Sequence, residues 1–139
     1  MSKKILCAID DSDHSKNALV MAANMAKAMG AELTILVVNQ LLGVGGKVGA
    51  PSYLWEDSEL KSILDKAVDT VKEAGFADPK TASVKSRDVP RAIVVFAEDK
   101  GFDHIVVGTG GKGSVSRLML GSVSRDVVYR AHCPVTIAR

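Results

Sequence analysis

Residues 104–114 of the chain read HIVVGTGGKGS, an apolar run that passes directly into a glycine-rich turn. The unbroken run at 104–107 predicts a buried strand. A glycine-rich turn that leaves such a strand brings backbone N–H groups close to a ligand, and a helix that starts just beyond it adds unpaired donors and the positive end of its dipole. This arrangement suits an anion, above all a phosphate. Taken by itself, the stretch is equally typical of a loop that binds nothing.

Composition places the chain among soluble globular proteins, as a single domain of residues 1–139. Apolar residues make up 47% of the chain and charged residues 24%, which excludes intrinsic disorder. The formal net charge is only +2, and the lysines and arginines are not clustered as a nucleic-acid-binding surface requires. With only six aromatic residues, a stacking platform for single strands is not expected either. Nucleic acid is therefore not an expected partner.

The cysteines, histidines and apolar runs bear on the cell compartment. Cys7 and Cys133 lie inside apolar segments, which predicts buried thiols in a reducing compartment. The three histidines are scattered, without the spacing of a zinc site. The N-terminal apolar run is too short for a signal peptide, and no later segment is long enough to span a bilayer. The sequence therefore predicts a cytoplasmic protein without membrane contact.

Apolar periodicity divides the chain into alternating strands and helices. Continuous apolar runs predict strands at 5–9, 33–38, 104–107 and 135–138, with a weaker, more polar strand near a sheet edge at 81–85. Amphipathic spacing predicts helices at 14–29, 58–73, 89–100 and 122–131, with a short helical turn at 115–120. Residues 40–57 are rich in glycine and contain the only tryptophan, Trp55. They are predicted to be a mobile surface loop, either a cover for a site or an insertion without function.

This order of elements predicts the fold class. Strands that alternate with helices indicate an α/β fold, a five-stranded, doubly wound parallel sheet of the Rossmann-like kind with helices on both faces. In such sheets ligands bind beyond the carboxyl ends of the strands, where the strand order reverses. Asp10 and Gly108 follow the first and the fourth predicted strands. If these two strands are neighbours, as we expect, the two residues lie together at that point.

Two phosphate-binding patterns fail against the glycine-rich turn. The Walker pattern requires a lysine and a hydroxyl residue directly after its last glycine, whereas Gly113 is followed by Ser114 and Val115. The sequence pattern of the dinucleotide-binding fingerprint is matched by Gly108-x-Gly110-x-x-Gly113. However, only 26 residues follow Gly113, and no later strand ends in an acid that could hold a ribose. Neither site is predicted.

A bacterial receiver-like domain is a stronger alternative. It would need paired acids after the first strand, an acid after the third and a hydroxyl after the fourth, and the chain offers Asp10, Asp11, Asp88 and Thr109. It would also need a lysine directly before a proline at the fifth strand, where the chain has Cys133. Without that ammonium group the charge balance for a phosphoryl group is incomplete, and the glycine-rich turn has no role.

A two-part glycine motif fits the chain better. The motif runs Gly108-x-x-Gly111, then nine residues, then Gly121-Ser122. This spacing resembles that of the universal stress protein family. The resemblance extends to the first strand with its acidic turn, to the second strand and to the terminal strand, so it covers essentially the whole chain. It implies a role in stress responses and the Rossmann-like fold of the adenine nucleotide alpha hydrolase type.

The ATP-binding branch of that family holds an adenine nucleotide, and the resemblance implies the same ligand here, as ATP, ADP or AMP. The amides and hydroxyl of the motif would hold the phosphates and ribose. The end of the first strand, its following acid and the end of the second strand would hold the adenine and its surroundings. The residues thus implied are Ala8, Ile9, Asp10, Val38, Val107, Gly108, Gly111, Lys112, Gly121, Ser122, Val123 and Ser124.

The residues themselves agree with this assignment. The pair Gly121-Ser122 precedes a predicted helix, so its amides and hydroxyl face an incoming phosphate. Lys112 adds a positive charge, although an exposed loop lysine is more often only solvated. Asp10 or Asp11 could hold Mg²⁺ through water, because that ion keeps most of its hydration. Helix capping is the other role open to Asp11, and to Ser12 as well.

The sequence departs from the family pattern after the third strand, and it lacks catalytic groups. Arg87 stands near the place where members of the family often carry a glycine, and it either crowds the pocket or contacts a phosphate. No histidine or glutamate is placed beside the phosphates, so no catalytic residue is predicted and hydrolysis would be slow at most. We therefore expect a regulatory nucleotide-binding protein. A nucleotide hydrolase and a nucleotide-independent interaction module are the alternatives.

The last predicted strand, Val135–Ala138, is short, apolar and rich in β-branched residues. If it lies at a sheet edge, its backbone can pair with that of a second copy. The resemblance implies a homodimer formed in this way. The alternative is an edge protected by Arg139 and solvent. A regulator of this kind also implies a further protein partner.

Overall fold

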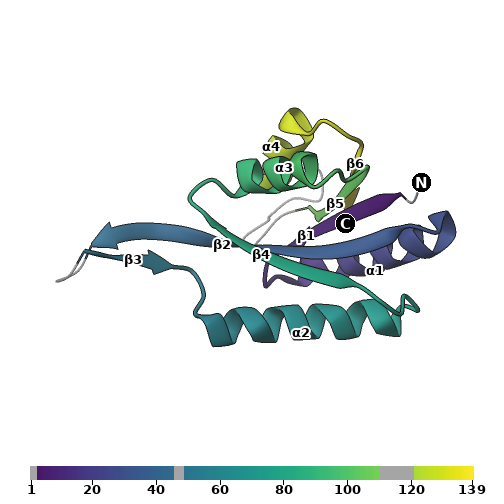
Figure 1. Ribbon diagram of the computed structural model, residues 1–139, viewed down its shortest axis with the longest axis horizontal. Helices are drawn as coiled ribbons and strands as arrows, with labels where there is room; N and C mark the ends of the chain where they lie inside the picture. Colours follow the sequence, from purple (N-terminus) through teal and green to yellow (C-terminus); the bar gives the residue numbers. More distant parts are fainter. Residues whose placement is uncertain (1–2, 46–48, 110–120) are drawn as a thin grey trace.

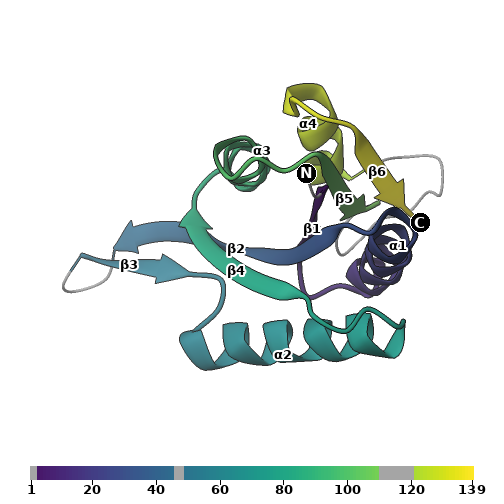
Figure 2. The same cartoon turned by 45° about the vertical axis from the view of Figure 1, so that its right-hand side comes forward.

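The computed structural model describes residues 3–45, 49–109 and 121–139 as a three-layer α/β structure (Figure 1). Its strands are β1 Lys4–Ile9, β2 Glu32–Gly45, β3 Ala50–Tyr53, β4 Lys80–Ser86, β5 His104–Gly108 and β6 Val135–Ala138. Its helices are α1 Asp13–Met29, α2 Asp57–Glu73, α3 Val89–Asp99 and α4 Ser122–Arg130. Helices α1 and α2 cover one face of the sheet, and α3 and α4 cover the other (Figures 1 and 2). The predicted α/β class is confirmed.

The main sheet is parallel, and its strand order determines where a ligand can bind. Strand β1 pairs with β2 on one side and with β5 on the other. Further out, β4 pairs with β2 and β6 pairs with β5, again in parallel. The chain therefore builds outward from β1 through β2 to β4, then returns to place β5 and β6 on the other side. The first and fourth predicted strands are neighbours, as expected, and among the described residues β4 and β6 form the two edges of this parallel sheet.

Side chains of β1 alternate between two hydrophobic cores. Ile5 and Cys7 face the core under α1 and α2, whereas Leu6 and Ala8 face the core under α3 and α4. Because both faces are covered, the strand has no polar alternation, which explains why its sequence is continuously apolar. Burial raises the pKa of the Cys7 thiol to about 12, so this side chain is a neutral part of the core. Cys133 is only half-buried, so the expectation of a buried thiol is confirmed for Cys7 alone.

The prediction of a loop at 40–57 is wrong for most of that segment, because strand β2 does not end at Val38. Strand β2 continues to Gly45 and pairs antiparallel with β3, with a register shift between Leu41 and Gly43. Residues 41–45 and β3 form a two-stranded β-arm that projects beyond the helical layers (Figures 1 and 2). Glycine and Pro51 are tolerated here because neither strand of the arm is a central strand.

Local sequence signals set the helix ends. Gly30, with φ of 62°, ends α1 in the left-handed conformation, as predicted. Helix α2 begins one residue earlier than predicted, where Glu56 and Glu59 form a capping box. Asp88 caps α3, and Pro90 lies in its first turn, as predicted. Within the described part of the chain, no helix combines the length and apolar character needed to cross a membrane.

Candidate functional site

The strand order reverses between β1 and β5, and the candidate site lies at the carboxyl ends of these strands. Ala8 of β1 is in register with Val107 of β5. One residue further on, the chain leaves β1 at Ile9 and enters the turn at Asp10, while β5 ends at Gly108. The observed pairing of β1 with β5 therefore brings Asp10 and Gly108 together at the carboxyl end of the sheet, as predicted. In open α/β sheets this is the place where ligands bind.

Thr109 joins the beginnings of two helices at this point. Its carbonyl oxygen accepts hydrogen bonds from the amide of Gly121 at 2.5 Å and from the hydroxyl of Ser124 at 3.2 Å, which fixes the N-terminus of α4. Its own Oγ1 lies 3.2 Å from Nδ1 of His14 in the first turn of α1, within hydrogen-bond distance. The N-termini of α1 and α4 are thus held at one residue. Each contributes unpaired N–H groups and the positive end of a helix dipole, a combination that favours an anion.

Gly108 has a packing role that its place in the glycine motif does not reveal. A Cβ atom at this position would lie 2.8 Å from the carbonyl oxygen of His14 and 3.0 Å from its carbonyl carbon. These atoms belong to the backbone of α1 and cannot move aside alone. Glycine at 108 therefore lets β5 pack closely against the first turn of α1, whatever the site binds.

The turn after β1 is organised by Asp10 and two serines. Oδ1 of Asp10 accepts hydrogen bonds from the amide of Ser12 at 2.9 Å and from the hydroxyl of Ser15 at 2.8 Å. Ser15 Oγ in turn accepts from the amide of Asp10 at 2.8 Å. The carboxylate of Asp10 thereby holds the chain at the start of α1 in an Asx-type turn.

Ser12 occupies the N-cap position of α1, but its hydroxyl makes no capping hydrogen bond. The capping role predicted for the Ser12 side chain is therefore wrong, and the amide of Ser15 donates instead to the backbone carbonyl oxygen of Ser12 at 3.1 Å. Asp11 precedes the N-cap and is exposed. Ser12 Oγ is buried without a hydrogen-bond partner among the described residues. A buried hydroxyl in this state costs free energy, and such groups commonly mark the place of a bound water or ligand.

The other residues implied by the resemblance differ in what they can offer a ligand. Ala8, Ile9, Val38 and Val107 are buried, so they form the floor at the strand ends. Val38 lies one strand away from the reversal, on β2, directly after the residue in register with Ile9. Gly121 is half-buried at the N-cap of α4, and the side chains of Ser122 and Val123 are exposed in its first turn. The structure therefore gathers these residues around a single end of the sheet.

Ser124 is 2% exposed, and its hydroxyl is already engaged. It donates to the carbonyl oxygens of Thr109 and Gly121, at 3.2 and 3.1 Å. Its observed contacts close the turn before α4. Gly111 and Lys112 lie outside the described residues, as does the short helical turn predicted at 115–120.

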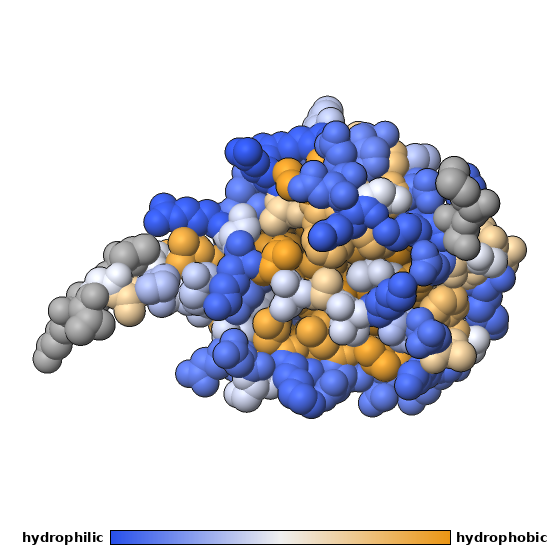
Figure 3. Space-filling model, in the orientation of Figure 1, coloured by the Kyte–Doolittle hydropathy of each residue, from blue (hydrophilic) through white to orange (hydrophobic). Residues whose placement is uncertain are grey.

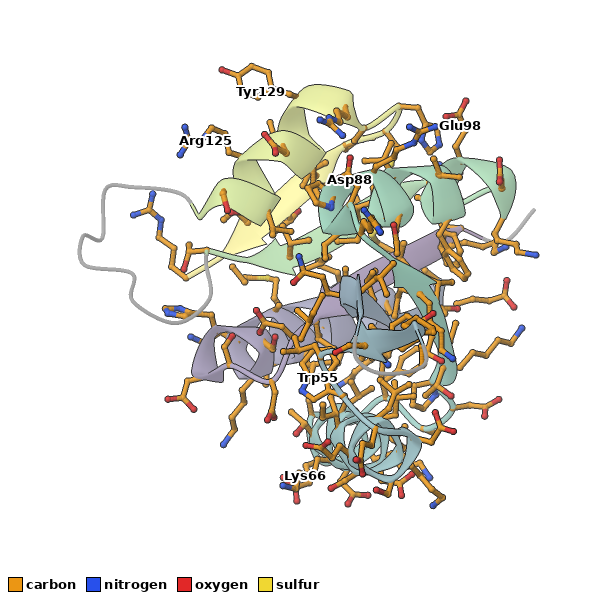
Figure 4. The ribbon with its side chains drawn as sticks, turned by 90° about the vertical axis from the view of Figure 1, so that its left-hand side faces the viewer. Trp55, Lys66, Asp88, Glu98, Arg125 and Tyr129 are labelled. Atoms are coloured by element: carbon orange, nitrogen blue, oxygen red, sulfur yellow. The ribbon has the colours of Figure 1, made fainter. Side chains whose placement is uncertain are left out.

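The segment after β4 lies away from the strand reversal. Because β4 pairs with β2 and not with β1, Arg87 is separated from Asp10 by the whole width of β2. Asp88, labelled in Figure 4, caps α3. It accepts from the amide of Arg91 at 3.2 Å and forms an ion pair with Arg130 of α4 at 3.3 Å. The backbone hydrogen bond and the two arginines lower the pKa of the Asp88 carboxyl.

This placement excludes the receiver-like alternative. A receiver-like sheet has the order 2-1-3-4-5, which puts its third strand beside the first. Here the third strand of the parallel sheet, β4, lies beyond β2. Asp88 therefore caps a helix and links α3 to α4, far from Asp10.

Sequence reasoning missed Ser12 and His14 as parts of this site and considered Thr109 only for the receiver pattern. The contact between His14 and Thr109 spans 95 residues of sequence, so no local pattern reports it. The one available signal was the position of Thr109, two residues after a predicted strand. Within the described ranges, no group of three or more His, Cys, Asp or Glu side chains could hold a metal ion.

Comparisons with known proteins agree with this geometry. The model of the universal stress protein family matches residues 1–139. A universal stress protein of Thermus aquaticus is 38% identical over 143 residues, which cover all of both chains. One from Methanocaldococcus jannaschii is 37% identical over 145 residues, which cover 99% of this chain and 82% of the relative.

Solved structures of the same kind share the fold. UspA from Lactobacillus plantarum superposes with a TM-score of 0.80 at 24% identity, covering 99% of this chain and 97% of the other. A universal stress protein in complex with cAMP has a TM-score of 0.75 at 27% identity, with 99% and 96% of the two chains covered. One from Archaeoglobus fulgidus in complex with dAMP has a TM-score of 0.70 at 28% identity, with 99% and 98% covered.

Proposed function

Because the chain belongs to the universal stress protein family, we propose that it is a regulatory protein that binds an adenine nucleotide, with ATP as the ligand. The proposal places the protein in the cytoplasm, in stress responses. Bound nucleotide would act by stabilising one conformation of the protein, as any ligand does that prefers one state to another.

The observation that carries the proposal is the meeting of two helix N-termini at Thr109. The amide of Gly121 and the first turn of α1 both contact this residue, at the point where the strand order reverses. A phosphate group is the anion that such paired N-termini bind best. The similar structures in complex with cAMP and dAMP support an adenosine phosphate as the ligand class.

We assign the proposed contacts by position. Ala8, Ile9, Asp10 and Val38 line the adenine side, through backbone groups and the Asp10 carboxylate. Val107, Gly108, Gly121, Ser122 and Val123 line the phosphate side, with Gly111 and Lys112 from the part of the chain that the structure does not describe. Ser124 keeps the turn before α4 closed. The unpartnered hydroxyl of Ser12 lies at the start of α1 beside this site, and it fits a site that is completed by a ligand.

A magnesium ion has no protein cage at this site within the described residues. Mg²⁺ in nucleotide sites is held chiefly by phosphates and water, with one or two carboxylates. We propose that any Mg²⁺ arrives with the nucleotide and that Asp10 or Asp11 contacts it through water.

Direct binding measurements test the proposal. The purified protein is titrated calorimetrically with ATP, ADP, AMP and cAMP, and its thermal unfolding is followed at saturating nucleotide. We expect binding and a rise in Tm with at least one adenine nucleotide, ATP above the others. Inorganic triphosphate serves as a control for simple anion binding. If none of the four nucleotides binds, or triphosphate binds equally well, the proposed function is wrong.

A pair of serine variants localises the binding. Ser122 is exposed in the first turn of α4, and Ser58 is exposed in the first turn of α2, so neither substitution should disturb the fold. Ser122→Ala should weaken nucleotide binding about tenfold, which corresponds to about 1.4 kcal/mol. Ser58→Ala should leave the affinity unchanged. Equal affinities for the two variants would place the phosphates elsewhere.

Hydrolysis is a separate question, because the proposal is for binding and regulation. Phosphoryl transfer requires a positioned base and strong charge stabilisation. His14 is the histidine closest to the site, and its ring is already engaged with Thr109. We expect phosphate release from ATP to be slow, at well under one turnover per minute. Faster release that Ser122→Ala abolishes would favour a nucleotide hydrolase.

A further inference from the structure

A groove lies between strand β4 and helix α3. It has a volume of about 350 Å³, and its apolar lining comes from Val84, Ala92, Val95 and Phe96. Strand β4 is the outermost strand of the parallel sheet on this side, beyond β2. The groove is therefore separated from the strand reversal between β1 and β5, and the proposed nucleotide site does not use it.

The groove is open because α3 packs inward over the sheet. Its buried side chains, Ile93, Val94 and Ala97, face the core. Val95 and its neighbours on the outer flank overhang the edge of the sheet, and Val95 remains 43% exposed. In Figure 3 apolar surface is visible in this central region, between the positions that α3 and α2 occupy in Figure 1. An apolar groove beside a sheet edge is typical of a binding surface.

The rim of the groove is positively charged. Lys85, Arg91 and Lys100 line it together with one acid, Asp99. The nearby Asp88, which Arg91 also influences, is ion-paired with Arg130. In the described part of the chain the ion pairs lie elsewhere: Lys61–Asp65, Lys80–Glu32 and Arg130–Asp88. Lys85 places its Nζ 4.7 Å from the centre of the Tyr53 ring, which leaves its charge uncompensated by a carboxylate. A partner for this groove is therefore expected to carry negative charge.

The exposed edge of β4 adds backbone groups to the groove. Residues 80–86 of β4 pair with β2, and no described residue pairs with their other side. An edge strand of this kind can take up an additional strand. Lys85, near the end of β4, opposes pairing with a basic edge and favours an acidic segment.

The spacing of the charges matches an extended chain. Arg91 and Lys100 are nine residues apart along α3 and its C-cap, about 13.5 Å at the helical rise. Four residues of a strand span about the same distance, at about 3.3 Å each. Val95 and Phe96 lie midway. A strand on β4 with acids at positions i and i+4 and an apolar residue at i+2 therefore directs all three side chains to the α3 side.

We propose that this groove binds an extended acidic segment of a partner protein, which adds a strand to β4. The apolar side chain of the segment enters the groove at Val95 and Phe96. The flanking carboxylates contact Arg91 and Lys100, and the backbone of the segment pairs with the free edge of β4. The recognised pattern is acid-x-apolar-x-acid.

Selection from a displayed library of random heptapeptides tests the proposal on the full chain. We expect wild-type protein to enrich peptides with the acid-x-apolar-x-acid pattern. A synthetic peptide of the enriched sequence should bind at least tenfold more weakly to Val95→Asp and to Arg91→Glu. The control Lys66→Glu makes the same charge change as Arg91→Glu on α2, which covers the other face of the sheet (Figure 4), and it should bind like wild type.

Further measurements keep the outcome decisive. Val95→Ser is the milder variant if Val95→Asp fails to fold, as judged by circular dichroism. Two N-methylated peptides are compared, one methylated at the odd-numbered amides and the other at the even-numbered amides. Only one of these two sets of amides faces β4, so one of the two peptides should not bind, because it has lost its hydrogen bonds to the strand. The proposal is overturned if no peptide is enriched, if the enriched peptides bind all the variants equally, or if both methylated peptides bind as tightly as the unmethylated one. It is also overturned if dodecanoate shifts the amide resonances of the groove while no peptide binds, because the groove is then a site for a fatty acid.

Discussion

At position 108 the chain has no room for a side chain, because a Cβ would lie only 2.8 Å from the carbonyl oxygen of His14. We expect Gly108→Ala to lower the free energy of unfolding by about 1–3 kcal/mol, as overpacking does in well-packed cores. Gly43→Ala is the matched control, since a Cβ at Gly43 meets nothing within 4 Å. Urea denaturation of both variants checks this. A loss of stability no greater at 108 than at 43 would show that the first turn of α1 gives way easily.

His104 should make stability depend on pH. Its Nε2 lies 2.7 Å from Oγ1 of Thr136, across the pairing of β5 with β6, and burial lowers its pKa. The unfolded chain keeps the ordinary histidine pKa of about 6.5. The unfolded state therefore binds a proton more readily, and stability falls as the pH drops through about 6.5 towards the lower folded pKa.

Substitution isolates this effect. His104→Gln retains an amide that can reach Thr136 but cannot titrate, so it should flatten the dependence of unfolding free energy on pH between about 5 and 7. His132 is exposed, and His132→Gln should leave the dependence in place. Denaturation series at several pH values make the comparison, and an unchanged slope in His104→Gln would assign the effect to another group.

At the scale of elements, one buried polar side chain of β2 ties down the segment that connects the β-arm to α2. Asn39 is 1% exposed, and its side-chain amide makes two hydrogen bonds with the backbone of Trp55. Nδ2 donates to the carbonyl oxygen of Trp55 at 2.9 Å, and Oδ1 accepts from the backbone N–H of Trp55 at 3.0 Å. Asn39→Ala leaves both backbone groups without partners, which should cost about 2 kcal/mol.

Trp55 reports this change directly, because it is the only tryptophan in the chain. It packs against the core under α1 and α2, so its fluorescence should shift to the red when Asn39→Ala loosens it. Asn24→Ala, an exposed position on α1, should leave the emission unchanged and should not lower the stability. Unchanged emission in Asn39→Ala would mean that the apolar contacts of Trp55 hold the segment without the asparagine.

How much the sequence could predict also differs between elements. Strands β1 and β5 were predictable because they are buried on both faces, so their sequences are unbroken apolar runs. The β-arm was not, because its glycines and Pro51 favour turns locally, whereas the pairing of β2 with β3 is what makes them strands. In the site, Asp10 and Gly108 follow from position after a strand. The contacts of Thr109 with His14 and Gly121 depend on tertiary packing and have no local signature.

At the scale of the whole molecule, the two edges of the parallel sheet differ in character. Strand β4 carries Lys80 and Lys85, which discourage pairing with an identical edge by charge repulsion. Strand β6 carries only apolar residues and one threonine. Helix α4 contacts β6 and exposes Val128 and Tyr129, the latter at 81%. The edge suited to a second copy of the chain is therefore β6, and we propose that the homodimer forms there, through Val135–Ala138.

The amides of β6 give this proposal a direct test. The amide of Ile105 donates to the carbonyl oxygen of Pro134 at 3.0 Å, so the carbonyl of Pro134 faces β5. Because alternate residues of a parallel strand face the same neighbour, the N–H groups of Val135 and Ile137 point away from the sheet. In a dimer paired through β6 these two amides are hydrogen-bonded across the interface. They should exchange with deuterium slowly at high protein concentration and rapidly on dilution, while the amide of Thr136 stays protected throughout.

Light scattering should give twice the 14.7 kDa mass of one chain over the same range of high concentrations. A single-chain mass at every concentration, or rapid exchange of the amides of Val135 and Ile137 in a dimer, would move the interface away from β6.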